Sequence, residues 1–333
     1  MRSSTTVRVI VALLVFQVVG VLAFGPEAFF QTEIIGLSNG LIFALVALGY
    51  TLVYGIIELI NFAHGDVFML GSMMAFLLIG PIFAVTGATP ILLKVGIILL
   101  VLGLTMLATA TLNVSIERVA YKPLRNAPKL APLISAIGMS FVLQNVGLLL
   151  AGPGNKSIDN IFGTANVLTA FGVEGITINV QQIFVAVVTV PLLIALTWFV
   201  RTTRQGRAMR ATAQDPDTAG LMGVDVNRTI AVTFLIAGLL AGAAGVVQIL
   251  YNNTTVWNLG FRFGLNSFTA AVLGGIGNLQ GAVLGAIVIG FVNAFSDRFL
   301  SANWTNAIVF GVLIAILVFR PTGLLGQQLA DRA

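Results

Sequence analysis

Residues 58–66 concentrate side chains that could do acid–base chemistry together. They read ELINFAHGD and hold two acids, an asparagine and the only histidine of the chain. A histidine beside carboxylates can act as the general base of a hydrolase, but no nucleophile elbow accompanies His64. Long apolar runs flank the segment on both sides, which favours a polar break between two membrane helices over a catalytic site.

Two roles fit this break. In the first it is a structural turn, in which Asp66 caps a helix that starts at Val67 and Gly65 permits the sharp bend. In the second, Asn61 and His64 help to form a gate at the cytoplasmic end of a transport pathway, because polar groups inside a membrane protein often line such paths. The residues themselves leave both roles open.

Other kinds of chemistry find little support in the sequence. The chain has no cysteine and one histidine, so disulfides are excluded, and neither a metal nor another cofactor is expected. The segment GPGNKS at 152–157 lacks the Gly-Lys-Ser/Thr core of a nucleotide-binding P-loop. We therefore expect no catalytic residue in this chain.

The composition identifies the class of protein that positions these residues. Of 333 residues, 58% are hydrophobic and 9% are charged, whereas soluble domains carry about 25% charged residues. The sequence predicts an all-α, polytopic transmembrane bundle, a single domain over 1–333 with about 8–10 membrane segments of roughly 20 residues. The segments are expected at residues 7–24, 34–57, 66–86, 90–113, 131–151, 181–200, 229–251, 266–279, 281–297 and 303–319.

Two of these segments are unusual. Segment 266–279 is short for a span and is expected to be a half-crossing or re-entrant helix buried in protein. Segment 7–24 could be a signal peptide, but the residues after it form a poor cleavage site, so a retained helix is expected.

Charged residues predict the orientation. With a cytoplasmic N-terminus, most of the 17 basic residues fall on the cytoplasmic side, as membrane proteins prefer, so both termini are expected inside. The basic residues thus indicate a membrane orientation and not a nucleic-acid partner. Polar groups within the spans are almost all uncharged, which argues against an ion-coupled carrier and places the energy source elsewhere.

The internal loop 201–228 has the sequence of a capped helix. Asp215 is placed as an N-cap, Pro216 as the first helical residue, Asp217 in the first turn and Gly223 as a left-handed C-terminal cap. The predicted helix is short and amphipathic, and it either lies on the bilayer surface or docks a cytoplasmic protein. Its apolar side chains are those of Ala219, Leu221 and Met222, and the arginines expected on the same coupling surface are Arg207 and Arg210.

Small and polar residues mark possible helix contacts. Gly277, Gly281 and Gly285 recur at four-residue spacing, which is typical of close helix packing. Polar breaks in NFAHGDVFMLG (61–71) and GNLQGAVLG (277–285) suggest a weak internal repeat, and such breaks can mark a transport pathway. Asn278 and Gln280 are pathway candidates on this basis. The polar residues in or beside the spans are Asn39, Tyr50, Gln144, Asn145, Gln248, Asn266, Asn278, Gln280 and Asn293.

Four segments carry a resemblance to a known family. They are GLSNGLIFALVALGYTLVYGIIELINFAHGDVFMLGS (36–72), ERVAYKPLRNAPKLAPLISAIGMSFVLQN (117–145), FTAAVLGGIGNLQGAVLGA (268–286) and RPTGLLG (320–326). Together they resemble the LivH-type permeases of bacterial branched-chain amino-acid ABC importers. The similarity covers residues 34–326, and permeases for urea or short amides look similar.

The resemblance implies a machine with several subunits in the bacterial inner membrane. This chain would pair with a second permease, either LivM-like or a second copy of itself. Two cytoplasmic ATPase subunits and an extracytoplasmic solute-binding protein would complete the importer, and 201–228 would correspond to its coupling loop. Leucine, isoleucine and valine are the expected solutes; a carrier or channel that works without ATP is the rival interpretation.

Overall fold

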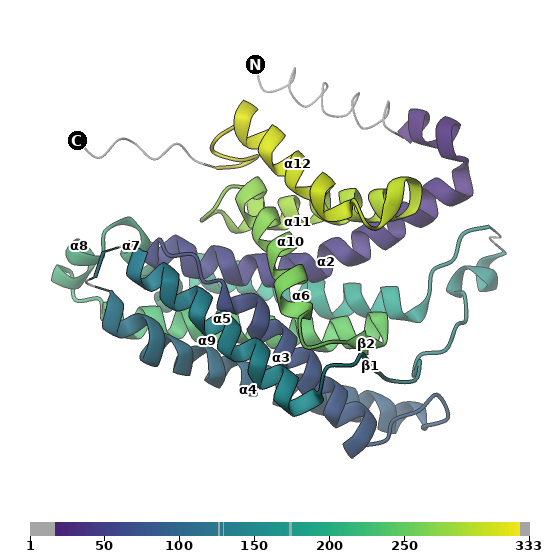
Figure 1. Cartoon of the computed structure of the whole chain (residues 1–333), viewed down its shortest axis with the longest axis horizontal. Helices are drawn as coiled ribbons and strands as arrows, with labels where there is room; N and C mark the ends of the chain where they lie inside the picture. Colours follow the sequence, from purple (N-terminus) through teal and green to yellow (C-terminus); the bar gives the residue numbers. More distant parts are fainter. Residues whose placement is uncertain (1–16, 126, 129, 173–174, 327–333) are drawn as a thin grey trace.

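The computed structural model describes residues 17–125, 127–128, 130–172 and 175–326 (Figure 1). Helices account for nearly all of the regular structure, as apolar segments with internally satisfied backbone groups require in lipid. The long helices are α2 (Pro26–Ile57), α3 (Ala63–Leu77), α4 (Ile91–Ile116), α5 (Leu130–Ala151), α6 (Val180–Thr202), α9 (Val226–Asn252), α10 (Leu259–Gly274), α11 (Leu279–Ser296) and α12 (Thr305–Phe319).

Shorter elements extend or join these helices. Strands β1 (Lys156–Ser157) and β2 (Thr254–Thr255) pair antiparallel. The π-helical turns are η1 (Leu78–Ile82), η2 (Glu117–Tyr121) and η5 (Asp297–Ser301), the 3₁₀ turns are η3 (Lys122–Leu124) and η4 (Val167–Phe171), and the two short α-helices are α7 (Arg204–Gln214) and α8 (Pro216–Leu221).

The predicted polytopic helical bundle is confirmed. Within the described residues, seven helices are long and apolar enough to cross a membrane when their π- and 3₁₀-helical extensions are included. The segment expected at 266–279 is instead α10, which begins at Leu259 and has 16 residues, and α12 has 15. The segment expected at 7–24 lies mostly outside the described residues; its residues 17–24 are helical.

Burial separates inner from outer helices. In the most apolar window of α2, 83% of the residues are buried, against 22% in the windows of α4, α5 and α6. Helix α2 runs between α11 and α9 through the middle of the molecule (Figure 1). The outer helices therefore expose apolar side chains to the surroundings, as expected where lipid replaces water.

Glycine allows α2 and α11 to pack closely. A Cβ atom built on Gly290 of α11 would lie 2.4 Å from the carbonyl oxygen of Gly36 and 2.4 Å from the nitrogen of Gly40, both in α2. No side chain fits there, so backbone meets backbone, as in other membrane helix pairs.

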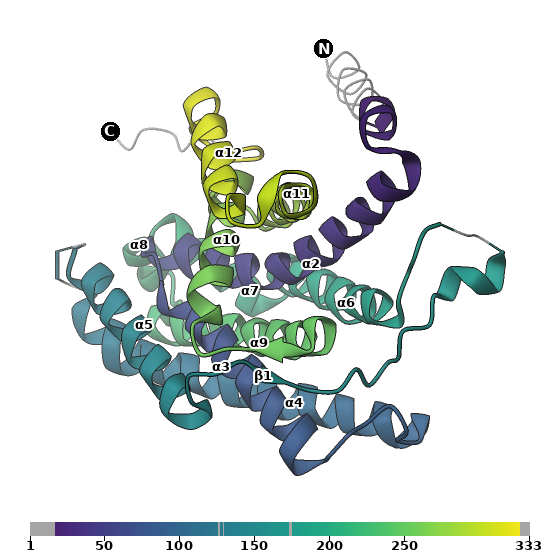
Figure 2. The same ribbon diagram turned by 45° about the vertical axis from the view of Figure 1, so that its right-hand side comes forward.

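The bundle has two distinct ends. Helix α9 begins three residues after the glycine that follows α8, and it ends beside β2. At about 1.5 Å per residue its length separates these ends by roughly 40 Å, enough to span a membrane. The turned view in Figure 2 shows the loop from β1 to α6 reaching away from the bundle.

Candidate functional site

A cavity of about 400 Å³ lies where α2, α5 and α10 meet. Its walls are mostly apolar and aromatic, and a polar edge interrupts them on the α5 side and at α2. The apolar lining consists of Phe62, Ile137, Phe141, Phe261, Leu265 and Phe268, and the remaining lining of Tyr50, Ser140, Gln144, Gly260 and Gly264.

The N-terminal parts of α3 and α10 touch beside this cavity. A Cβ atom on Gly65 would lie 2.5 Å from the carbonyl oxygen of Gly260 and 2.9 Å from Cα of Gly264. Gly65 is helical here, so the bend predicted at this residue is wrong. The chain instead turns at residues 58–62, after Glu58 ends α2 in a left-handed conformation with φ of 52°. A glycine is needed at position 65 because the backbones of α3 and α10 are in contact there and leave no room for a side chain.

Asp66 is also placed differently from the prediction. Helix α3 starts at Ala63 rather than at Val67, so Asp66 lies inside the first turn and does not cap it. Its side chain is only 1% exposed, and one carboxylate oxygen accepts a hydrogen bond from the Ser140 hydroxyl. The Gln144 amide nitrogen donates to Ser140 Oγ at 3.1 Å. Helix α5 therefore supplies the polar partners of the α3 acid.

Asn61 and His64 occupy different surroundings. Asn61 accepts a 2.6 Å hydrogen bond from the Tyr121 hydroxyl and lines a small hollow next to the cavity. His64 is fully buried against α2, where its ring meets that of Tyr50 edge-on at 5.0 Å between centroids. A Cβ atom on Gly49 would overlap the His64 ring, so α2 leaves room for it there. The cavity is not lined by His64.

The start of α11 holds two predicted pathway residues, of which Asn278 has a structural task. Asn278 caps α11 by accepting from the backbone nitrogens of Gln280 and Gly281, and its amide donates to the Leu325 carbonyl at 2.8 Å. The Gln280 side chain is exposed. For Gly277 the structure differs from the packing role expected, because φ is +89° and no atom lies within 4 Å of a built Cβ. It forms the turn before α11.

The other two glycines of this group lie against α10. A Cβ atom on Gly281 would stand 2.2 Å from the carbonyl oxygen of Gly274. One on Gly285 would stand 2.1 Å from that of Ala270. Helices α10 and α11 thus pack backbone against backbone along this stripe, which fixes α10 beside the cavity.

The α7–α8 protrusion is the second candidate surface. Asp215 caps α8 by accepting from the backbone nitrogens of Asp217 and Thr218, with Pro216 as the first helical residue, as predicted. Gly223, with φ of +86°, donates to the Gly220 carbonyl and closes the helix. The same internal loop also contains α7 at residues 204–214, a helix that was not singled out from the sequence.

Side chains on this protrusion divide into buried and exposed sets. Ala219 packs inside the protein, while Leu221 and Met222 are 89% and 82% exposed. The guanidinium of Arg207 donates to the Thr202 carbonyl at 3.1 Å, and that of Arg210 donates to the Val200 carbonyl. These arginines therefore satisfy carbonyls at the C-terminal end of α6, where a positive charge is favoured.

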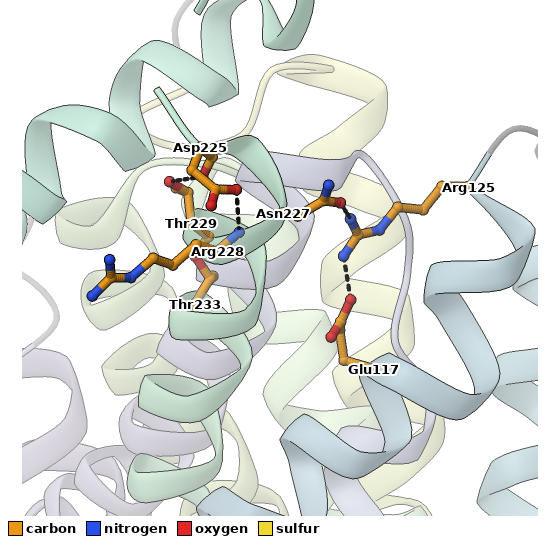
Figure 3. A network of polar contacts seen from close by, with 7 residues as sticks. All are labelled: Glu117, Arg125, Asp225, Asn227, Arg228, Thr229 and Thr233. Atoms are coloured by element: carbon orange, nitrogen blue, oxygen red, sulfur yellow. Dashed lines mark hydrogen bonds and ion pairs between the residues drawn. The ribbon is translucent and has the colours of Figure 1, made fainter. Parts of the chain in front are cut away.

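A polar network holds the start of α9 next to this protrusion (Figure 3). Arg125 forms an ion pair with the buried Glu117 and donates to the Asn227 side chain at 2.6 Å. Asp225 caps α9 by accepting from the Arg228 backbone nitrogen. The end of α4 and the start of α9 are thereby tied together.

Sequence reasoning found part of this site. Tyr50 and Gln144 stood out as polar residues in apolar spans, whereas Ser140 and Tyr121 did not. Serine is common in membrane helices, where its hydroxyl can bond to its own helix backbone, so its type alone carries no signal. Contact with Asp66 distinguishes Ser140, and that contact joins residues 74 positions apart.

Comparison with known proteins decides the family. The family described as branched-chain amino acid transport system / permease component matches residues 34–318. The chain belongs to this family. No solved structure matches the chain.

Several curated members of this permease family are similar over nearly their whole length. The high-affinity branched-chain amino acid transport system permease protein BraD of Pseudomonas aeruginosa is 41% identical, over 92% of this chain and 99% of its own. The corresponding LivH protein of Escherichia coli K12 is 40% identical, over 91% and 97%. A probable LivH permease of Methanocaldococcus jannaschii is 30% identical, over 85% and 88%.

Family and fold together give the location and type of this permease. It is a multi-pass protein of the inner membrane, with seven long apolar helices in its described part. Its relatives are components of transport systems and not enzymes. The orientation with both termini inside stays a prediction.

Proposed function

We propose that this chain is the permease subunit of an ATP-driven importer for leucine, isoleucine and valine. The observation that carries the proposal is the cavity between α2, α5 and α10, with apolar aromatic walls and a short polar edge. Its volume of about 400 Å³ falls within the usual range of small-molecule sites. A branched aliphatic side chain gains from burial against such walls, and the polar edge orients the rest of the solute.

The cavity is open toward the outside of the bundle, which supports a second permease subunit. Phe141 and Phe261 line it and are 61% and 57% exposed. In the assembled importer a LivM-like chain or a second copy covers this side and completes the pathway. Asn61, His64 and the Gly65–Asp66 turn of α3 form the inner gate, with Asn278 and Gln280 near the exit.

The remaining partners follow from the two ends of the bundle. Of the two cytoplasmic ATPase subunits, one docks on the coupling region 201–228 of this chain and the other on the second permease, and a solute-binding protein docks on the opposite end. ATP hydrolysis on the partner chains shifts the population between inward-open and outward-open forms, which differ by movements of packed helices. This chain itself contributes the conduit and the docking surface.

Reconstitution tests the proposal directly. The complete complex in proteoliposomes is expected to accumulate labelled leucine, isoleucine and valine only with ATP on the ATPase side. Urea and short amides serve as competing solutes. Preferred uptake of urea would show that urea, and not a branched-chain amino acid, is the transported solute. Leucine flux through the purified single chain without nucleotide would contradict the ATP-driven mechanism.

Filling the cavity is expected to block transport without unfolding the protein. Leu265→Trp adds a bulky ring to the lining, so solute and indole compete for one space. We expect leucine uptake to fall about tenfold or more, the effect of losing roughly 1.4 kcal/mol of binding. The matched control is Ile314→Trp in α12, at a side chain that is exposed and outside the cavity. Equal loss in both variants would contradict the assignment of the cavity.

Weakening the caps of α8 is expected to weaken ATPase docking. Asp215→Ala removes the N-cap acceptor, which costs about 1 kcal/mol of helix stability. Gly223→Val places a branched side chain at φ of +86°, which is strained for such a residue. Pull-down of the ATPase by the solubilised permease measures the loss, with the open-space variant Gly220→Ala as control. Full ATPase binding by both cap variants would contradict the docking role.

A further inference from the structure

We propose that Asp66, acting through Ser140 and Gln144, makes the polar edge of the cavity selective for the ammonium group of its solute. This inference rests on the proposed function and names the group that this edge recognises. The carboxylate is a positioning residue, because Ser140, Gln144 and Gly260 separate it from the cavity that they line.

The hydrogen-bond chain has a defined direction. The Ser140 hydroxyl donates to Asp66, so its oxygen is left as an acceptor. The Gln144 amide nitrogen donates to that oxygen at 3.1 Å. Because the nitrogen of the amide is bonded to Ser140, the carbonyl oxygen of Gln144 is the atom left for a ligand.

Asp66, the acid at one end of these hydrogen bonds, is deeply buried at the start of two helices. Asp66 is 1% exposed, and its second carboxylate oxygen has no hydrogen-bond partner among the described residues. It lies in the first turn of α3, and a Cβ atom on Gly260, in the first turn of α10, would be 2.6 Å from that oxygen. The N-terminal ends of two helices, which carry partial positive charge, therefore converge on the carboxylate.

The edge of the cavity thus offers acceptor oxygens of Ser140 and Gln144, with the Asp66 carboxylate behind them. An ammonium group offers three donors and a positive charge, so it satisfies such an edge, whereas a hydroxyl in its place offers one donor and no charge. The cavity would then hold an α-amino acid with its ammonium group at α5 and its branched side chain against the aromatic walls. A neutral isostere would lose a charge-assisted hydrogen bond.

Competition binding to the permease–ATPase complex in nanodiscs tests this without the solute-binding protein. The tracer is labelled leucine, and the competitor is 2-hydroxy-4-methylpentanoate, in which a hydroxyl replaces the ammonium group. In the native complex the competitor is expected to bind about tenfold or more weakly than leucine, the effect of one charge-assisted hydrogen bond. In Asp66→Asn this difference is expected to fall to about threefold or less.

A second variant and its control test the same inference independently of Asp66→Asn. Ser140→Ala retains the acid but removes the hydroxyl that links it to the edge, and it is expected to lose the same discrimination even if Asp66→Asn fails to assemble. Ser135→Ala is the control, because its hydroxyl bonds to the Ala120 carbonyl of η2 and not to the cavity. Undiminished discrimination in assembled Asp66→Asn or in Ser140→Ala would overturn the inference. A native complex that binds no leucine would instead count against the proposed function.

Discussion

Replacing Gly285 by leucine is expected to prevent this permease from accumulating as a folded protein. The new Cβ atom would lie 2.1 Å from the carbonyl oxygen of Ala270 and 2.8 Å from the nitrogen of Gly274. Both are backbone atoms of α10, so no rotamer change relieves the clash and the helices must separate. Overpacking of this kind costs about 3 kcal/mol or more, a large share of the roughly 5–15 kcal/mol that keeps a protein folded.

The chain offers a matched control for this experiment. Among the residues that the structure describes, no atom lies within 4 Å of a Cβ built on Gly311 in α12, so Gly311→Leu adds the same side chain to a helix without a clash there. The yield of monodisperse protein and the midpoint of thermal unfolding in detergent measure the difference. A Gly285→Leu protein as abundant and as stable as Gly311→Leu would show that α10 and α11 do not depend on this contact.

Placing acids on the tip of α8 is expected to abolish transport while the permease stays folded. Leu221 and Met222 are 89% and 82% exposed in the described part of the chain, so aspartate side chains at these positions would face the surroundings of the permease. If an ATPase subunit covers these side chains, the double variant buries two charges in an apolar contact, which costs several kcal/mol. ATPase binding and ATP-driven leucine uptake should then fall together, by about a hundredfold or more.

The control exchanges the two residues and keeps the tip apolar. Leu221→Met combined with Met222→Leu preserves the buried area, so ATPase binding and uptake should stay close to native values. Thermal unfolding of both proteins shows whether the fold is intact. Normal uptake by the aspartate variant would place the ATPase contact elsewhere on the protein.

The two candidate surfaces are joined by the polar contacts at the cytoplasmic end of the proposed orientation. Arg125, which is paired with Glu117, bonds to the start of α9, and α9 directly follows the α8 protrusion. At the same end, Tyr121 of η2 holds Asn61 before α3. A movement of the protrusion is therefore connected by packed and hydrogen-bonded elements to the helix that carries Asp66. This gives the coupling proposed above a physical route, since packed interfaces move as units.

The sequence by itself determined the class of the protein, its family and the local capping of α8. Apolar length decides membrane insertion, and the Asp215, Pro216 and Gly223 caps act within one helical turn, so neither depends on distant residues. Only the tertiary structure decided what the Glu58–Asp66 segment contacts. Gly65 faces the α10 backbone, and Asp66 meets a serine 74 positions away. Such contacts depend on how whole helices pack, which no local spacing of residue types encodes.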